Sequence, residues 1–95
     1  MTLYEPVTPD QLQRKLSDID RQIVTLLAAG LTHKEIGQAM GYAPHTMKNR
    51  VYQTYRRVGL RGSAALVAWA LLTDNVNRDD VRELLTQRYP HLMDV

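Results

Sequence analysis

The sequence predicts an all-α protein, a compact helix-turn-helix bundle of about five helices. Three observations support this expectation. Apolar residues recur at helical spacing along most of the 95-residue chain, capping residues and glycines separate these stretches, and no segment alternates apolar and polar residues as a half-buried strand does. A chain of this length forms one modest hydrophobic core. We therefore expect a single small folding unit.

Two of the expected helices meet at a tight corner within residues 31–60. A capping box that begins at Thr32 opens the first helix. Gly41 can adopt the left-handed conformation that closes a helix, and a short corner after it has the length that a helix-turn-helix requires. Pro44 suits the first turn of the second helix, which we expect to run to Val58.

The second helix sorts its side chains into an apolar stripe and a polar stripe. The apolar stripe, which should face the core, contains Met47, Val51, Tyr55 and Val58. The polar stripe on the opposite side contains His45, Lys48, Asn49 and Tyr52, and it is flanked by Thr46, Arg50, Arg56 and Arg57. Asn and Lys can address base edges in the major groove, and Arg can hold phosphates. The alternative is an ordinary surface helix of a bundle.

Charge distribution favours a nucleic-acid face. The chain has a net charge of +2, but residues 31–62 hold six basic residues against Glu35 alone. The segments before and after them are slightly acidic. Positive charge concentrated on one segment is the electrostatic signature of a DNA-binding surface.

The N-terminal part offers two helix starts, at Thr8 and at Ser17. One apolar stripe continues across both, so we favour a single, nearly continuous helix over residues 9–29. The alternative is two helices that meet near Leu16. Residues 1–7 show no periodic pattern and are expected to be extended or frayed.

The C-terminal part contains two further helices. Ser63 is expected to cap a helix over residues 64–73 that is apolar on every face, and Asn77 to cap a last helix that Pro90 stops. A helix that is apolar all round must be covered on more than one side. The core of so small a protein covers one side. Either the C-terminal segment or a second copy of the chain must cover the other.

Composition argues against several functional classes. The chain has no cysteine, which fits a reducing cytoplasm and excludes disulfides and thiolate metal sites. No signal peptide is recognisable. The longest apolar run, at residues 64–72, is about half as long as a membrane span, so we expect no membrane partner.

No catalytic, metal or cofactor site is expected. The histidines His33, His45 and His91 lie in separate segments without metal-ligand spacing. The serines Ser17 and Ser63 stand at helix starts, where capping explains them. The sequence also lacks a glycine-rich phosphate loop. We therefore do not expect an enzyme.

Three sequence blocks, GLTHKEIG at 30–37, HTMKNRV at 45–51 and RRVGLRGSAALVAWA at 56–70, resemble the DNA-binding domain of LuxR/GerE-type transcriptional regulators. The resemblance implies a four-helix unit whose third helix enters the major groove and whose fourth commonly forms a dimer interface. It also implies three parts: an N-terminal extension (1–15, partly helical), the LuxR-type domain (16–73) and an added C-terminal helix (74–95). Met1 and the caps at both ends favour a complete small protein.

The resemblance also assigns site residues. Base edges would be contacted by His45, Lys48, Asn49 and Tyr52. The DNA backbone would be contacted by Lys34, Thr46, Arg50 and Arg57, and Arg56 joins them because of its place beside the polar stripe. A dimer interface would contain Ala65, Ala68, Trp69 and Leu72.

Several residues depart from the family pattern. Asp20 replaces a common glutamate, and Arg50 stands where histidine is common. Gly37 replaces the usual alanine, which should cost up to about 1 kcal/mol of helix stability. Ala43 stands where a capping serine is frequent, so the second helix loses a cap of roughly 1 kcal/mol.

We expect a prokaryotic, cytoplasmic regulator that binds double-stranded DNA sequence-specifically as a homodimer and is nucleoid-associated when bound. One alternative is a protein-binding modulator, an anti-activator or co-regulator that pairs with RNA polymerase or another regulator. A second is a sigma-factor-like promoter-binding domain, which would have to contact the polymerase.

Overall fold

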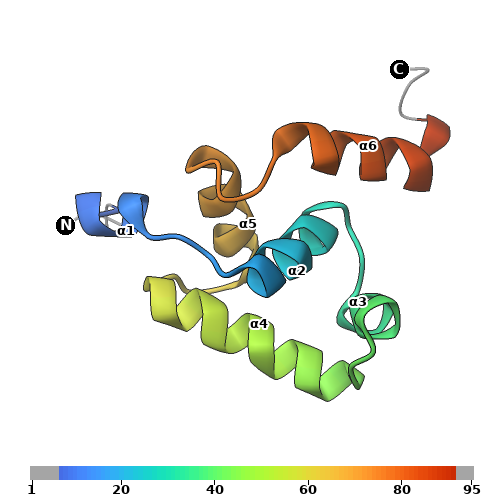
Figure 1. Cartoon of the computed structure of the whole chain (residues 1–95), viewed down its shortest axis with the longest axis horizontal. Coiled ribbons are helices and arrows are strands. Elements are labelled where there is room, and N and C mark those ends of the chain that lie inside the picture. Colours follow the sequence, from blue (N-terminus) through green and yellow to red (C-terminus); the bar gives the residue numbers. More distant parts are fainter. Residues whose placement is uncertain (1–6, 92–95) are drawn as a thin grey trace.

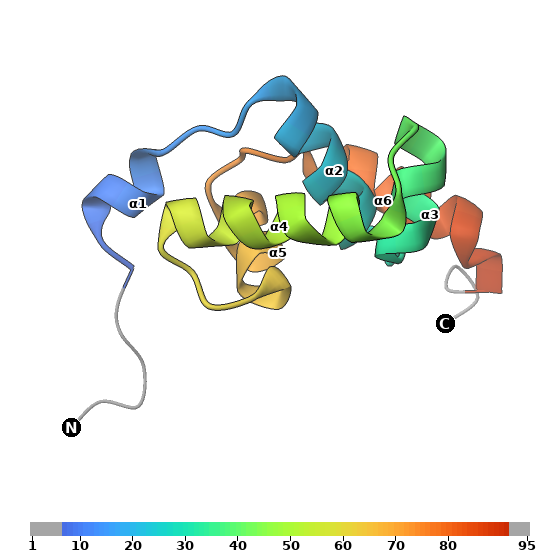
Figure 2. The ribbon, with the colours of Figure 1, turned by 90° about the horizontal axis from the view of Figure 1, so that it is seen from below.

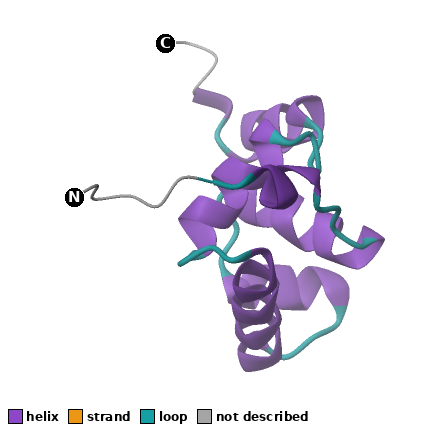
Figure 3. Cartoon of the chain, turned by 90° about the vertical axis from the view of Figure 1, so that its left-hand side faces the viewer, coloured by secondary structure: helices purple, strands orange, loops and turns teal. Residues whose placement is uncertain are grey.

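The computed structural model describes residues 7–91, and this part of the chain forms six α-helices and no strand (Figures 1 and 3). The helices are α1 (Pro9–Gln13), α2 (Asp18–Ala28), α3 (His33–Met40), α4 (Pro44–Val58), α5 (Ser63–Leu72) and α6 (Arg78–Arg88). The all-α prediction is confirmed. Residues 1–6, which were expected to be extended or frayed, lie outside the described residues. None of the helices in residues 7–91 is both long and apolar enough to cross a bilayer.

The continuous helix expected over residues 9–29 is wrong, and the alternative of two helices meeting near Leu16 is correct. Arg14 adopts an extended conformation (φ −68°, ψ 146°) directly after α1. The side chain of Asn75 explains the break: its Oδ1 accepts from the Leu16 amide at 2.8 Å, and its Nδ2 donates to the Arg14 carbonyl at 3.0 Å. Ser17 then caps α2 by accepting from the Asp20 amide. A buried side chain far along the sequence thus overrides local helical periodicity.

The helix-turn-helix is confirmed. The side chain of Thr32 accepts from the Glu35 amide at 3.1 Å while Glu35 accepts from the Thr32 amide at 2.9 Å, so the capping box is complete. Gly41 has φ 81°, in the left-handed region, and the chain turns there into α4. The end of α4 is closed in the same way by Gly59, at φ 88°.

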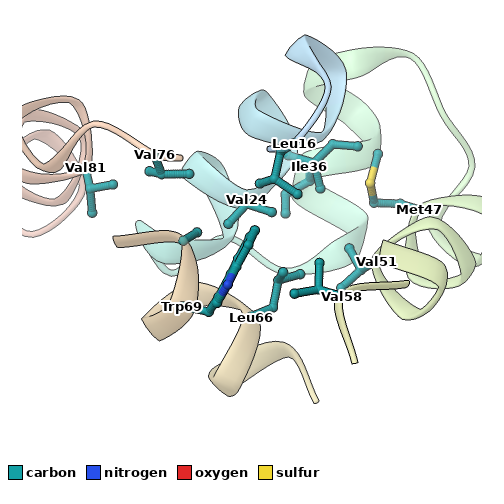
Figure 4. Packing of buried hydrophobic residues seen from close by; sticks show 12 residues of the cluster. Leu16, Val24, Ile36, Met47, Val51, Val58, Leu66, Trp69, Val76 and Val81 are labelled. Carbon is teal, nitrogen blue, oxygen red and sulfur yellow. The ribbon is translucent and has the colours of Figure 1, made fainter. Parts of the chain in front are cut away.

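The core is assembled around α2, which contacts α3, α4, α5 and α6. Figure 4 shows the side chains of these elements converging, with the Trp69 ring directed toward Val24. The buried cluster contains Leu16, Ile23, Val24, Ile36, Met47, Val51, Val58, Leu66, Trp69, Ala70, Val76 and Val81. The third, fourth and fifth helices are therefore held on one scaffold.

The α5 helix is apolar all round, as expected, but only one side is covered. Leu66, Trp69 and Ala70 are buried, whereas the side chain of Leu72 on the other side is 82% exposed. The α6 helix packs on α2 rather than over this face (Figure 1). The expectation that Ser63 caps α5 is wrong: Gly62 is the N-cap residue, with extended backbone and no side-chain cap bond, so Ser63 is the first residue of the helix.

Candidate nucleic-acid interface

The polar stripe of α4 faces solvent. All four residues expected at base edges, His45, Lys48, Asn49 and Tyr52, are exposed. The opposite side of α4 is buried at Met47, Val51, Thr54 and Val58, and Tyr55 packs against the core from its border. In Figure 2, α4 runs across the face of the molecule that is turned toward the viewer. The polar and basic side chains on this side of α4 are therefore exposed to solvent.

Tyr52 is held in place by its neighbours. Its ring lies edge-to-face with that of Tyr55, with ring centroids 5.3 Å apart and an interplanar angle of 76°. The Arg56 guanidinium lies 5.7 Å from the Tyr52 ring centroid, within the range of a cation–π contact. The aromatic residue of the stripe therefore has a preferred orientation before any ligand binds.

A buried carboxylate anchors two arginines of α4. The side chain of Asp20, on α2, is only 4% exposed. Its two oxygens accept from Arg50 Nε at 3.0 Å and from Arg57 Nη2 at 2.8 Å. The Arg50 and Arg57 side chains remain 38% and 61% exposed, so both stay partly open to solvent. Asp20 thus holds one nitrogen of each arginine.

This role of Asp20 was not anticipated from the sequence, where Asp20 was noted only as a replacement for a glutamate common in the family. A signal was present. Arg50 and Arg57 stand seven residues apart, which places them on one side of a helix. Asp20 is an acidic residue within the apolar stripe of the segment that forms α2, so it could have been expected to pair with them. The remaining expected backbone contacts, Lys34, Thr46 and Arg56, are exposed and lie on α3 or α4.

The two ends of α4 are stabilised differently. At the start, Ala43 makes no side-chain cap hydrogen bond, as its departure from the family pattern predicts. At the end, Gln11 Nε2 donates to the Val58 carbonyl at 3.0 Å and Arg14 Nη1 donates to the Arg57 carbonyl at 2.8 Å. These carbonyls would otherwise lack an intrahelical partner. The N-terminal residues therefore complete the C-terminal end of α4, a role that the sequence did not indicate.

The Trp69 side chain connects the segment around Gln11 to the core. Its indole Nε1 donates to the Gln11 carbonyl at 2.8 Å, and the residue is 3% exposed. Of the four residues expected at a dimer interface, Ala65, Ala68 and Leu72 are exposed on the outer side of α5, whereas Trp69 lies inside the core.

Gly37 on α3 makes a close backbone approach. A Cβ at this position would lie 2.4 Å from the Tyr42 carbonyl oxygen, far inside the contact distance. The Tyr42 amide donates to the Gly37 carbonyl at 2.8 Å. The corner between α3 and α4 therefore passes directly over this glycine.

Within residues 7–91, no group of three or more His, Cys, Asp or Glu side chains could hold a metal ion. The site has the composition of an electrostatic and hydrogen-bonding surface.

A model of the luxR family of bacterial regulatory proteins matches residues 14–70, which is more than half of the chain. The chain belongs to this family. Residues 14–70 carry a LuxR-type helix-turn-helix DNA-binding domain of the kind found in transcriptional regulators rather than enzymes, and α1 and α6 lie outside the matched residues.

A curated relative agrees with this assignment. Over 48 residues the chain is 40% identical to the putative HTH-type transcriptional regulator YhjB of Escherichia coli (strain K12). The match covers 50% of this chain and 24% of YhjB, so the chain aligns with about a quarter of that relative. No solved structure gives a significant match.

Proposed function

We propose that this LuxR-family protein is a sequence-specific transcriptional regulator that binds DNA as a homodimer, in the bacterial cytoplasm, with α4 in the major groove. The observation that supports this proposal most directly is that the polar stripe of α4 faces solvent. His45, Lys48, Asn49 and Tyr52 would read base edges. The backbone would be held by Lys34, Thr46, Arg50, Arg56 and Arg57.

The geometry of the domain supports the proposed docking. In a helix-turn-helix the second helix reads the groove while neighbouring elements contact phosphates. Arg50 and Arg57 are anchored by Asp20 and still partly exposed, so they would meet phosphates at little further cost in side-chain entropy. The exposed side of α5, at Ala65, Ala68 and Leu72, would bury its apolar surface against a second copy.

Selection of bound sequences from a random DNA pool, followed by footprinting, tests the proposal. We expect one enriched motif. Lys48→Ala and Asn49→Ala should each weaken binding to it by about 1–3 kcal/mol and relax the preference for individual bases. Arg82→Ala is a matched control, since Arg82 is an exposed basic residue of α6. A pool without an enriched motif, or unchanged affinity in both α4 variants, would contradict the proposal.

A second candidate function is a protein-binding modulator that pairs with another regulator or with RNA polymerase. The observation in its favour is α6, which lies outside the residues matched by the family and packs on α2, away from α4. Such a modulator need not bind DNA specifically. Sedimentation with and without core polymerase, on the same preparation used for DNA selection, separates the two functions.

A further inference from the structure

A groove lies between α2, the end of α3 and α6, and it has a volume of about 830 Å³. Its apolar lining includes Leu26 of α2, Met40 of α3 and Leu84 of α6, all partly exposed. The segment between α5 and α6 also lines the groove, at residues 74–77. Apolar surface is thus left open to solvent where three helices meet.

The rim of the groove is acidic. Asp74, Asp80 and Glu83 line it, and the basic residue among the lining side chains, Arg21, is paired with Asp18. Asp80 and Glu83 stand three residues apart and therefore lie on adjacent turns on one side of α6. A groove that combines apolar side chains with carboxylates is complementary to a helix with apolar residues on one side and basic residues beside them.

We propose that this groove docks a basic amphipathic helix of a partner protein. More than half of the lining residues belong to α6 or to residues 74–77, which lie outside the part matched by the luxR family, so the groove forms where an added segment meets the DNA-binding domain. In Figure 1, α6 and α4 lie on opposite sides of α2. A helix in the groove would therefore leave α4 free. If the protein is a protein-binding modulator, this groove indicates that its partner presents a basic amphipathic helix. A regulator bound to DNA through α4 could bind the same partner.

Two labelled, stapled peptides of about 14 residues, which is about four helical turns, serve as probes. They carry the same leucines at helical spacing and differ only in having lysine or glutamate at the flanking positions. Fluorescence anisotropy with the full chain should show binding of the lysine peptide, weakened by added salt, and no binding of the glutamate peptide.

Substitutions on the rim test where the peptide binds. Asp80→Asn and Glu83→Gln should each weaken binding of the lysine peptide by roughly two- to fivefold, the range of a partly exposed ion pair. Asp79→Asn is the matched control, because Asp79 is also an exposed first-turn residue of α6 but does not line the groove. Amide chemical shifts of the labelled protein should move around Leu26, Met40 and Leu84 on addition of the peptide.

Three results would overturn the proposal: no binding of the lysine peptide, equal binding of both peptides, or shift changes confined to α4 or α5. DNA affinity is measured on the same samples and should be unaffected by the peptide. If the unmodified protein binds no DNA specifically but still binds the lysine peptide, only the DNA-binding proposal fails. The failures of the two proposals are therefore distinguishable.

Discussion

Asp20 connects α2 to α4 through two ion pairs. Its carboxylate is buried and accepts hydrogen bonds from two guanidiniums of α4, so it joins the first helix of the LuxR-type domain to the proposed recognition helix. Removing one member of a buried charged group leaves the remaining partners unsatisfied. Here both arginines are partly exposed, and water can compensate for part of the loss.

We expect Asp20→Asn to lower the free energy of unfolding by about 1–2 kcal/mol, because two charge-assisted hydrogen bonds weaken while solvent screens the arginines. Asp18→Asn is the matched control: it is also in the first turn of α2, but its side chain is 86% exposed and pairs only with Arg21 of the same helix. Urea denaturation of both variants makes the comparison. Equal effects would mean that the ion pairs of Asp20 with α4 add no more stability than an exposed pair within α2.

Gly37 gives a case in which helix propensity and tertiary structure predict opposite signs. Propensity alone predicts that Gly37→Ala stabilises the protein by up to about 1 kcal/mol. Because an added Cβ would collide with the Tyr42 carbonyl, we expect a loss of about 1–3 kcal/mol instead. Thermal denaturation decides the sign. Gln38→Ala, at an exposed position of the same helix, should change stability by less than about 0.5 kcal/mol.

Glu35 links α3 to α6 through an ionised contact. Its Oε1 accepts from Arg88 Nη2 and from the Thr32 amide, both at 2.9 Å. The Arg88 hydrogen bond, and after it the Thr32 amide, lower the pKa of Glu35 from 4.5 to about 2. The same contact raises the pKa of Arg88.

A depressed carboxylate pKa stabilises the fold above the unfolded value and loses its effect as pH falls toward the folded value. The Glu35 contribution should therefore be complete above about pH 4.5 and disappear toward pH 2. In Arg88→Gln we expect the Glu35 pKa to rise toward 4.5, as measured by carboxyl NMR titration. Arg82→Gln, at another exposed basic residue of α6, should leave it unchanged. An unchanged pKa in Arg88→Gln would mean that the capping box alone holds the charge.

The α5 helix is apolar on all sides, but only one of its sides is buried. One side supplies Leu66 and Trp69 to the core, and the other presents Ala65, Ala68 and Leu72 to solvent. Because α6 packs on α2, no described element of the chain covers this second side. Apolar surface of this kind is stabilised by burial against a partner.

If a second copy covers α5, Leu72→Glu and Ala68→Glu should yield a folded monomer that binds the selected DNA site more weakly. The fold should survive, since both side chains are already exposed. Sedimentation over a range of concentrations measures the assembly, and circular dichroism checks the fold. Arg78→Glu, on the exposed surface of α6, is the control for added negative charge. Dimers that persist in both α5 variants would exclude this interface.

At the scale of the whole molecule, charge is distributed unevenly between two sides. Basic residues concentrate on α4, which carries four of them and no acidic residue, whereas α6 holds three arginines and three carboxylates and is neutral. This basic helix should orient the protein with α4 toward a polyanion.

A dimer of this design should bind two half-sites about one helical turn apart, roughly 34–36 Å. With several phosphates contacted by each subunit, affinity for the selected site should fall on the order of a thousandfold between about 50 and 200 mM salt. Filter binding across that range gives the slope, and Lys48→Ala should leave it nearly unchanged if Lys48 reads a base. A flat salt dependence would exclude a phosphate-holding role for the α4 arginines.

The all-α class, the helix-turn-helix and the polar stripe of α4 could be predicted from the sequence, because capping boxes, left-handed glycines and helical periodicity are local signals. The other features depend on tertiary contacts. Asn75 binds the backbone between α1 and α2, and Asp20 pairs with two arginines of α4. Gln11 donates to a carbonyl at the end of α4, and the Tyr42 carbonyl leaves no room for a Cβ at Gly37. Each of these contacts joins groups that become neighbours only after the core has formed. A pattern read along the chain therefore predicts which side of α4 is exposed, but not which distant side chains hold that side in place.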